Sequence, residues 1–528
     1  MDTVLTVLER SVQIADKLKL QTIVIVFDQA IYSKAQTIRW QTELFKNRTV
    51  LRLGEFHTAM TYLACIGKWF GDAGLRDIII EAELCAEGSL TGVLSGHHYN
   101  RSVRCHKLIY EALHRLRWQS FLEEISETDY NLVKKVISDL KEHFPSHMYA
   151  EVAVSPEYNT VYQKYVGFIK SKSKCPTFRF WSSYLEMIEI LLLFLRATKE
   201  GNWALHLSAV RAMCPWMLIT NRNKYARYLP IYYLEMMSLQ ETHPDVHNMF
   251  VNGEFVVQRQ ARYGFSQVAC DMAIEQTCNR DTKTKGGMVG FTLNKGASQR
   301  WILSHPERAQ ITKACFGYAG RDSQGRDRKD LDKPHSVREE SAICRIIECM
   351  EGFINPFSRE SEDLIHIVSG VVVPEVIASD IMTAEERGRF CFTQFCKDRL
   401  LSNKKSFHDT ISNLKLKSFS SVGKIIKTKC SQKEMDLKSG RNLMARLAII
   451  GRERGIKIED LLKYSLGPLP LSLAYTDGGL MRTSKAKLMH YLCESIPSSI
   501  AKGLPSESVW ILDAMAVLQS ISINHNKH

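Results

Sequence analysis

The stretch Gln21–His57 most constrains what this chain can fold into. A β-branched run, Ile23–Val26, leads through Phe27 to Asp28; a helix-periodic segment follows, and a second apolar run ends at Glu55–His57. Strand, helix and strand in this order predict a βαβ unit, whose crossover makes the two strands parallel. Both strands then present polar residues at the carboxyl edge of the sheet, where open α/β sheets place their sites.

The rest of the chain is expected to be mostly helical. Helical periodicity runs almost without interruption from Thr58 to Leu239. A short hairpin with a turn at Asn252–Gly253 is expected at Phe250–Gln260, and a helix at Ser266–Arg280. The sequence therefore predicts an α/β part joined to a large all-α part.

Length and composition exclude several classes of protein. A chain of 528 residues is too long for one core, and 45% hydrophobic with 24% charged residues is ordinary for a globular protein. The N-terminus lacks a signal-peptide pattern, and the longest apolar run, Ile188–Leu195, is too short for a membrane span. Fourteen cysteines without a C-x-x-C pair indicate reduced thiols. We therefore expect a protein of the nucleus or cytoplasm that is not secreted and does not enter a membrane.

Positive charge is concentrated in one segment. Residues 397–457 hold sixteen Lys and Arg against five Asp and Glu, a net charge of +11 within a chain total of +13. Such a segment suits a phosphate backbone, although a solvated helical face or an interdomain surface would have the same composition. A basic, glycine-bearing loop at residues 283–301 is a second candidate. The lysines predicted to contact nucleic acid are Lys283, Lys285, Lys404, Lys405, Lys415, Lys417, Lys424, Lys427 and Lys429.

Three acidic positions are candidates for nucleic-acid chemistry. Asp28 ends the first strand, Glu55 lies with His57 just past the second, and Glu275 lies on the helix after the long helical block. Oxygen ligands so placed suit Mg²⁺ or Mn²⁺, so Asp28, Glu55 and Glu275 are candidate metal ligands, and Asp28, Glu275 and His57 candidate catalytic residues. Alternatively, Asp28 caps the following helix, His57 is a packed or capping residue, and Glu275 is an ordinary helix-face carboxylate.

In this order of motifs the chain resembles the catalytic region of transposases with a ribonuclease H-like fold, the hAT class in particular. VIVFDQA (Val24–Ala30) matches the strand with the second catalytic Asp, and VLRLGEFHTAM (Val50–Met60) matches the segment ending in His. The helical block matches the insertion, and the helix with Glu275 matches the last acid. The resemblance implies a truncated ribonuclease H-like parallel-strand core with a long helical insertion. In intact relatives such carboxylates hold two metals about 4 Å apart for DNA strand cleavage or transfer.

A second resemblance covers nearly the whole chain. The blocks FDQAIYSKA, NKYARYLPIYYLEM and PLPLSLAYTDGGLMRTSKAKL, among others, resemble a large uncharacterised family of invertebrate proteins that we expect to be transposon-associated.

The chain also departs from the transposase pattern. A complete ribonuclease H-like core begins with a hairpin sheet that carries the first Asp, whereas this chain begins at the helix that should follow it, and Asp2 and Asp16 lie in that helical segment. We therefore expect a catalytically incomplete protein, such as a fragment or a decayed or domesticated transposable element. The apolar run before Asp513 is expected to begin another α/β domain.

These observations predict five parts: the first part of the core (1–57), the all-helical insertion (58–240), the return to the core with Glu275 (241–320), a helical basic domain (341–500) and the start of a strand–Asp unit (501–528). The expected function is that of a transposase-derived nucleic-acid-binding protein.

DNA is the favoured partner, with RNA and a homo-oligomer left open, and Mg²⁺ or Mn²⁺ is expected only if the protein is active. The alternatives are a non-catalytic helical interaction scaffold and a protein that binds nucleic acid only through its basic segment.

Overall fold

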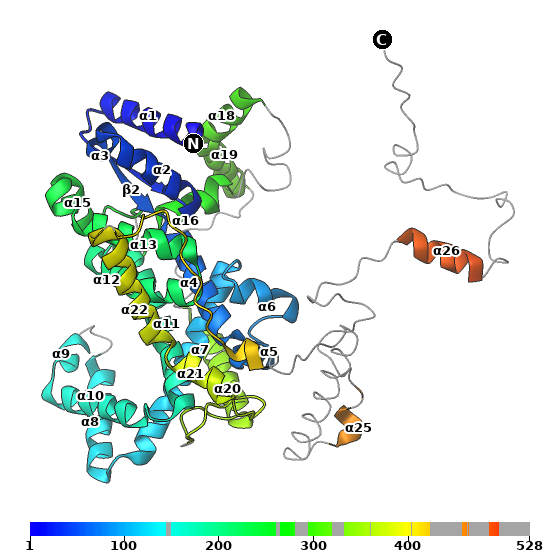
Figure 1. Ribbon diagram of the computed structural model, residues 1–528. Helices are drawn as coiled ribbons and strands as arrows, with labels where there is room; N and C mark the ends of the chain where they lie inside the picture. The colour runs from blue at the N-terminus through cyan, green and yellow to red at the C-terminus, as the bar shows by residue number, and fades with distance from the viewer. Residues whose placement is uncertain are drawn as a thin grey trace. The chain divides into compact units, whose positions relative to one another are not determined.

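The computed structural model describes residues 1–143, 149–259, 265–279, 294–318, 332–358, 361–402, 404–422, 457–461, 463 and 485–495. The chain divides into two compact units, residues 1–431 and 432–528. The described part of the first unit is predominantly helical and contains one pair of strands (Figure 1).

The predicted βαβ unit is confirmed. Its strands are parallel, and their register runs from Ile23 opposite Thr49 to Phe27 opposite Leu53. All five residues of the second strand are buried, whereas all five of the first are only partly buried. The elements are α1 (Asp2–Lys17), β1 (Ile23–Phe27), α2 (Gln29–Gln41), α3 (Glu43–Arg48) and β2 (Thr49–Leu53).

The long helical block is also confirmed. Its first helix begins at Glu55 rather than at Thr58, which places Glu55 and His57 in the first helical turn. The block comprises α4 (Glu55–Phe70), the 3₁₀ turn Gly71–Ala73, α5 (Leu75–Glu81), α6 (Glu87–Leu94), α7 (Tyr99–Glu124), α8 (Glu127–His143), α9 (Tyr149–Ala153), α10 (Pro156–Lys172), α11 (Pro176–Glu200), α12 (Trp203–Ile219), α13 (Asn223–Met237) and α14 (Leu239–Thr242).

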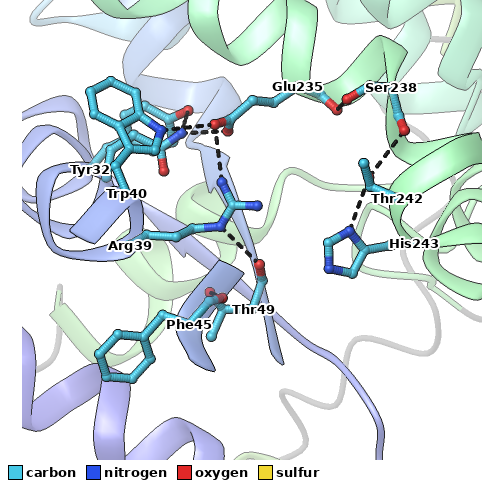
Figure 2. Close-up of polar contacts among 10 residues, drawn as sticks. Tyr32, Arg39, Trp40, Phe45, Thr49, Glu235, Ser238, Thr242 and His243 are labelled. Carbon is cyan, nitrogen blue, oxygen red and sulfur yellow. Dashed lines mark hydrogen bonds and ion pairs between the residues drawn. The ribbon is translucent and has the colours of Figure 1, made fainter. Parts of the chain in front are cut away.

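An ion pair fixes the βαβ unit onto the helical block at the end of the strands opposite Asp28 (Figure 2). Arg39 of α2 donates to the carbonyl oxygen of Thr49 over 3.1 Å and to Glu235 of α13 over 3.0 Å. The indole nitrogen of Trp40 donates to the same carboxylate over 3.3 Å. Because these contacts join α2, β2 and α13, they set how the strand pair lies on the helices.

The return segment after the block differs from its prediction in one respect. The hairpin expected at Phe250–Gln260 is wrong, because α15 (Pro244–Val251) extends into it. Gly253 has φ +85°, and the N–H groups of Gly253 and Glu254 donate to the carbonyls of Phe250 and Met249. This is a Schellman ending, which requires a left-handed glycine just as a hairpin turn does.

Past this turn, Val257 pairs with Val268 in an antiparallel bridge, and the chain enters α16 (Cys270–Ile274) and a π-helical turn (Glu275–Asn279). The predicted helix at Ser266–Arg280 is therefore present in a shorter form that begins after Ala269.

The remaining described elements are helices joined by irregular segments. The described helices are not long and apolar enough to cross a membrane, and the described cysteines are free thiols. The predicted strand–Asp unit at 501–528 lies outside the described residues. The helices are α18 (Lys295–Leu303), α19 (His305–Tyr318), α20 (Lys333–Gly352), α21 (Glu375–Met382), α22 (Ala384–Cys396) with a π-helical turn (Lys397–Leu401), α23 (Phe419–Val422), α25 (Ile458–Leu461) and α26 (Lys485–Ser495).

Candidate functional site

Asp28 lies at the carboxyl end of β1, as predicted, and caps the next helix. Its Oδ1 accepts a hydrogen bond of 2.9 Å from the backbone N–H of Ile31, in the extended conformation of an N-cap residue. The side chain remains partly exposed. The capping alternative is therefore confirmed, and a second role for this carboxylate stays a prediction.

His57 lies at the same edge of the strand pair, in the first turn of α4. Gly54 connects β2 to this helix and donates its N–H to the carbonyl of Phe27, which continues the pairing of the strands. The imidazole Nδ1 lies 3.0 Å from Oδ2 of Asp271, and the His57 side chain is 32% exposed. His57 is therefore oriented by a carboxylate while part of its ring remains accessible.

Asp271, on α16, is the residue that the sequence analysis missed. Its Oδ1 accepts from the N–H of Phe56 and its Oδ2 from the N–H of His57, each over 3.1 Å, so it caps α4 from a distant part of the chain. A negative charge is favourable at a helix N-terminus. The available sequence signal was its spacing of four residues from Glu275, which places the two acids on one helix face.

The close approach of Asp271 depends on the glycine before α4. A Cβ atom at position 54 would lie 2.3 Å from Oδ2 of Asp271. Any larger residue there would displace the carboxylate or the helix start. The strand–glycine–helix turn is thus fitted to its distant cap.

Glu275 joins the same region from the π-helical turn after α16. Its Oε1 accepts a hydrogen bond of 2.7 Å from Asn279, and its side chain is partly buried. The hydrogen bond to Asp271 raises the pKa of His57, burial opposes this rise, and the negative charges of Asp271, Glu275 and Asp28 support it. Three carboxylates from two distant parts of the sequence therefore favour the protonated form of one imidazole. We call Asp28, His57, Asp271 and Glu275 the acidic edge.

Tyr225 of α13 borders the acidic edge. Burial raises the pKa of Tyr225 to about 12, hydrogen bonds with Thr61 and Thr58 lower it, and the charges of Asp271 and Asp28 raise it. The phenol is therefore neutral at physiological pH.

Glu55 points into the core, where it forms an ion pair with Arg52; the two side chains are 2% and 1% exposed. Arg52 also donates to the carbonyl of Phe255, and its guanidinium carbon lies 5.2 Å from the ring centres of Phe250 and Phe255. The charge of Glu55 is thus already neutralised. Its predicted role as a metal ligand would require this buried ion pair to break.

The acidic edge does not fit a metal ion as it is arranged. Among the described residues, no group of three or more His, Cys, Asp or Glu side chains could hold one. Asp271 is instead engaged by the backbone N–H groups of Phe56 and His57 and by the His57 ring, and Glu55 is engaged by Arg52. The set predicted from sequence, Asp28, Glu55 and Glu275, is therefore not brought together as a ligand cluster.

The predicted nucleic-acid contacts are only partly described. Lys404, Lys405, Lys415 and Lys417 are exposed on a segment of turns and irregular backbone, residues 404–418, which we call the strap. Lys283, Lys285, Lys424, Lys427 and Lys429 lie outside the described residues.

A pH prediction follows from the His57 environment. Because the folded-state pKa of His57 is raised, its protonated form stabilises the fold fully below the unfolded-state pKa of about 6.5, and this contribution is lost as pH rises through the folded-state value. We expect a histidine NMR titration to show His57 titrating above the ordinary range. The variant Asp271→Asn should lower this pKa, and an unshifted titration in the unsubstituted protein would contradict the geometry.

The protein is predominantly helical and is built on a parallel βαβ unit, and carboxylates surround a histidine at the carboxyl edge of its strands. Residues 1–465 match the model of a family described as "Domain of unknown function (DUF8702)", and the chain belongs to this family. No curated protein and no solved structure matches the chain.

Proposed function

We propose that this protein is a transposase-derived nucleic-acid-binding protein whose βαβ unit is part of a ribonuclease H-like core and which is catalytically incomplete. One observation carries the proposal: the carboxyl end of β1, which Asp28 follows, and α16, which carries Asp271 and leads into Glu275, come together beside His57, whose Nδ1 lies 3.0 Å from Asp271. The helical block α4–α14 lies between them in sequence. The transposase resemblance implies this order and this convergence.

The engagement of the carboxylates supports catalytic incompleteness. Metal-dependent phosphate chemistry needs carboxylate oxygens that converge on the metal ions. Here Asp271 accepts hydrogen bonds at both oxygens, and Glu55 is buried against Arg52. Intact relatives would cleave or transfer DNA strands, whereas this chain would retain only the binding surface.

Positive charge supports a nucleic-acid partner, and the transposase resemblance favours DNA over RNA. The net charge of the chain is +13, and four of the predicted lysines are exposed on the strap. When binding depends on phosphate neutralisation, the logarithm of the association constant falls linearly as the logarithm of the salt concentration rises. The slope is about −0.9 for each phosphate contact with duplex DNA. This slope separates electrostatic binding from other association.

The test uses the full chain and fluorescence anisotropy with labelled duplex DNA, single-stranded DNA and RNA in the presence of EDTA. We expect binding without added metal, which weakens with salt along the linear relation. A dissociation constant weaker than about 10⁻⁴ M at physiological salt for all three probes would overturn the proposal.

A second experiment tests the incompleteness. The labelled DNA is incubated with the protein and Mg²⁺ or Mn²⁺, and we expect no cleavage or strand transfer, with the variant Asp28→Asn indistinguishable from the unsubstituted protein. Cleavage that is lost in Asp28→Asn would show an active site and contradict this part of the proposal.

A non-catalytic helical interaction scaffold is the second candidate. It is favoured by the structural use of the acids, because Asp28 caps α2, Asp271 caps α4 and Glu55 pairs internally. The binding assay separates the two candidates, since a scaffold would leave all three nucleic-acid probes unbound.

A further inference from the structure

The strap is held in a defined shape by an arginine in the π-helical turn that follows α22. Arg399 is 9% exposed. Its guanidinium donates to four strap carbonyls over 2.7–3.2 Å, those of Ser406, Phe407, Asp409 and Thr410. One planar side chain thus fixes five consecutive residues of an otherwise irregular segment.

A second arginine supports the same turn from α13. Arg227 donates to the carbonyl of Phe407 and, over 2.7 Å, to that of Asp409. The Phe407 ring lies against Trp40 and Tyr228, with ring centres 5.1 and 5.4 Å apart. The turn is therefore anchored by both hydrogen bonds and aromatic packing.

The other half of the strap is fixed at the start of α13. The side-chain amide of Asn221 donates to the carbonyl of Leu414 and accepts from its N–H, over 3.0 and 2.8 Å. Asn223 donates to Ile411 and Asn413, and the backbone N–H of Lys417 donates to Asp380 over 3.0 Å. The strap lies between the π-helical turn after α22 and the short helix α23 (Figure 1).

The outer side of the strap is basic. Residues 404–418 contain four lysines and one acid, Asp409. All four lysines are exposed, while a carboxylate oxygen of Asp409 accepts from the strap's own Ser406 N–H over 3.0 Å. Lys405 is paired with Asp398 over 3.2 Å, with the lysine side chain 59% exposed. Such an exposed pair is worth little and yields readily to a phosphate.

The strap and the acidic edge share the first turn of α13. Asn223 binds the strap, and Tyr225, two residues further, borders Asp271 and Asp28.

We propose that the strap is a preformed contact surface for the phosphate backbone of DNA, and that Arg399 and Arg227 are positioning residues that hold its lysines without touching the DNA. The proposal rests on the proposed function, because it requires that the protein bind nucleic acid. It adds the surface that does so and the residues that shape it.

The test compares two kinds of variant in the full chain, with a labelled DNA duplex as the probe. Neutralising Lys404, Lys405, Lys415 and Lys417 together to Gln should weaken binding and make the salt slope shallower by up to about 3.6, since each lost phosphate contact contributes about 0.9. Arg399→Lys keeps the charge but cannot reach four carbonyls with one planar fork. This variant should weaken binding about tenfold and leave the salt slope unchanged. The reason is that the strap and its lysines would be mobile in the free protein, so that binding would have to order them at a cost in conformational entropy.

Controls keep the outcomes distinct. Arg211→Gln, an exposed arginine on α12, removes a charge away from the strap and should change affinity less than Arg399→Lys does. Asn223→Ala loosens the other half of the strap and replaces Arg399→Lys if thermal unfolding shows that the arginine variant does not fold.

Wild-type affinity in a folded Arg399→Lys or Asn223→Ala variant would overturn the positioning role. An unchanged salt slope in the fourfold lysine variant would overturn the strap as the contact surface. In either case the proposed function would stand if the unsubstituted protein binds DNA. If the unsubstituted protein does not bind DNA, both the proposed function and the role of the strap are overturned.

Discussion

Replacing Arg52 by Met is expected to destabilise the protein by about 3–5 kcal/mol. The variant would leave the carboxylate of Glu55 unpaired at a position only 2% exposed, and it would also remove the donor to the Phe255 carbonyl. Removing one partner of a buried ion pair is costly because the remaining charge keeps its desolvation penalty. The free energy of unfolding, measured with a chemical denaturant, gives this difference.

The matched control is the double variant Arg52→Met with Glu55→Gln. It should recover a large part of the lost stability, because no uncompensated charge stays in the core. A single variant as stable as the unsubstituted protein would show that Glu55 is not buried against Arg52. A double variant no better than the single one would assign the loss to the aromatic and carbonyl contacts of Arg52 instead.

Replacing Gly54 by Ala is expected to destabilise the protein by about 1–3 kcal/mol, the cost of overpacking a fitted site. The new methyl group would lie 2.3 Å from Oδ2 of Asp271. That carboxylate cannot retreat without giving up the N–H groups of Phe56 and His57. The unfolding free energy and the NMR titration of His57 should change together, since both depend on the position of Asp271.

A double-mutant cycle tests this explanation. Combined with Asp271→Gly, the Gly54→Ala change should cost much less than it does alone, because the clash partner is gone. Additive losses would show that the glycine is needed for another reason, such as the backbone geometry of the strand-to-helix turn.

Local patterning accounts for the part of the fold that the sequence predicts. The run Ile23–Val26 before Asp28, the crossover and the second run define the parallel strand pair, because strand and helix periods differ along the chain itself. The helical block is recognised for the same reason. The dipeptide Asn252–Gly253 shows the limit, since a left-handed glycine ends a helix or turns a hairpin equally well. The helix that precedes it decided the outcome.

The candidate site divides in the same way. Asp28 and His57 were predicted at the carboxyl edge from the βαβ pattern, because adjacent parallel strands end together. Asp271 was missed because its partners, the N–H groups of Phe56 and His57, lie more than 200 residues away in sequence. Glu55 was predicted as a metal ligand, but its side chain points into the core toward Arg52, whose guanidinium lies among aromatic rings.

The sequence by itself therefore determined the βαβ unit, the helical block and the place of Asp28, since each depends on residues that are close in the chain. Only the tertiary structure decided that Asp271 caps α4, that Glu55 is neutralised by Arg52 and that Arg399 shapes the strap. The physical reason is that hydrogen-bond and ion-pair partners are chosen by proximity in space. A carboxylate has the same letter in the sequence whether it binds a ligand, a helix terminus or a buried arginine.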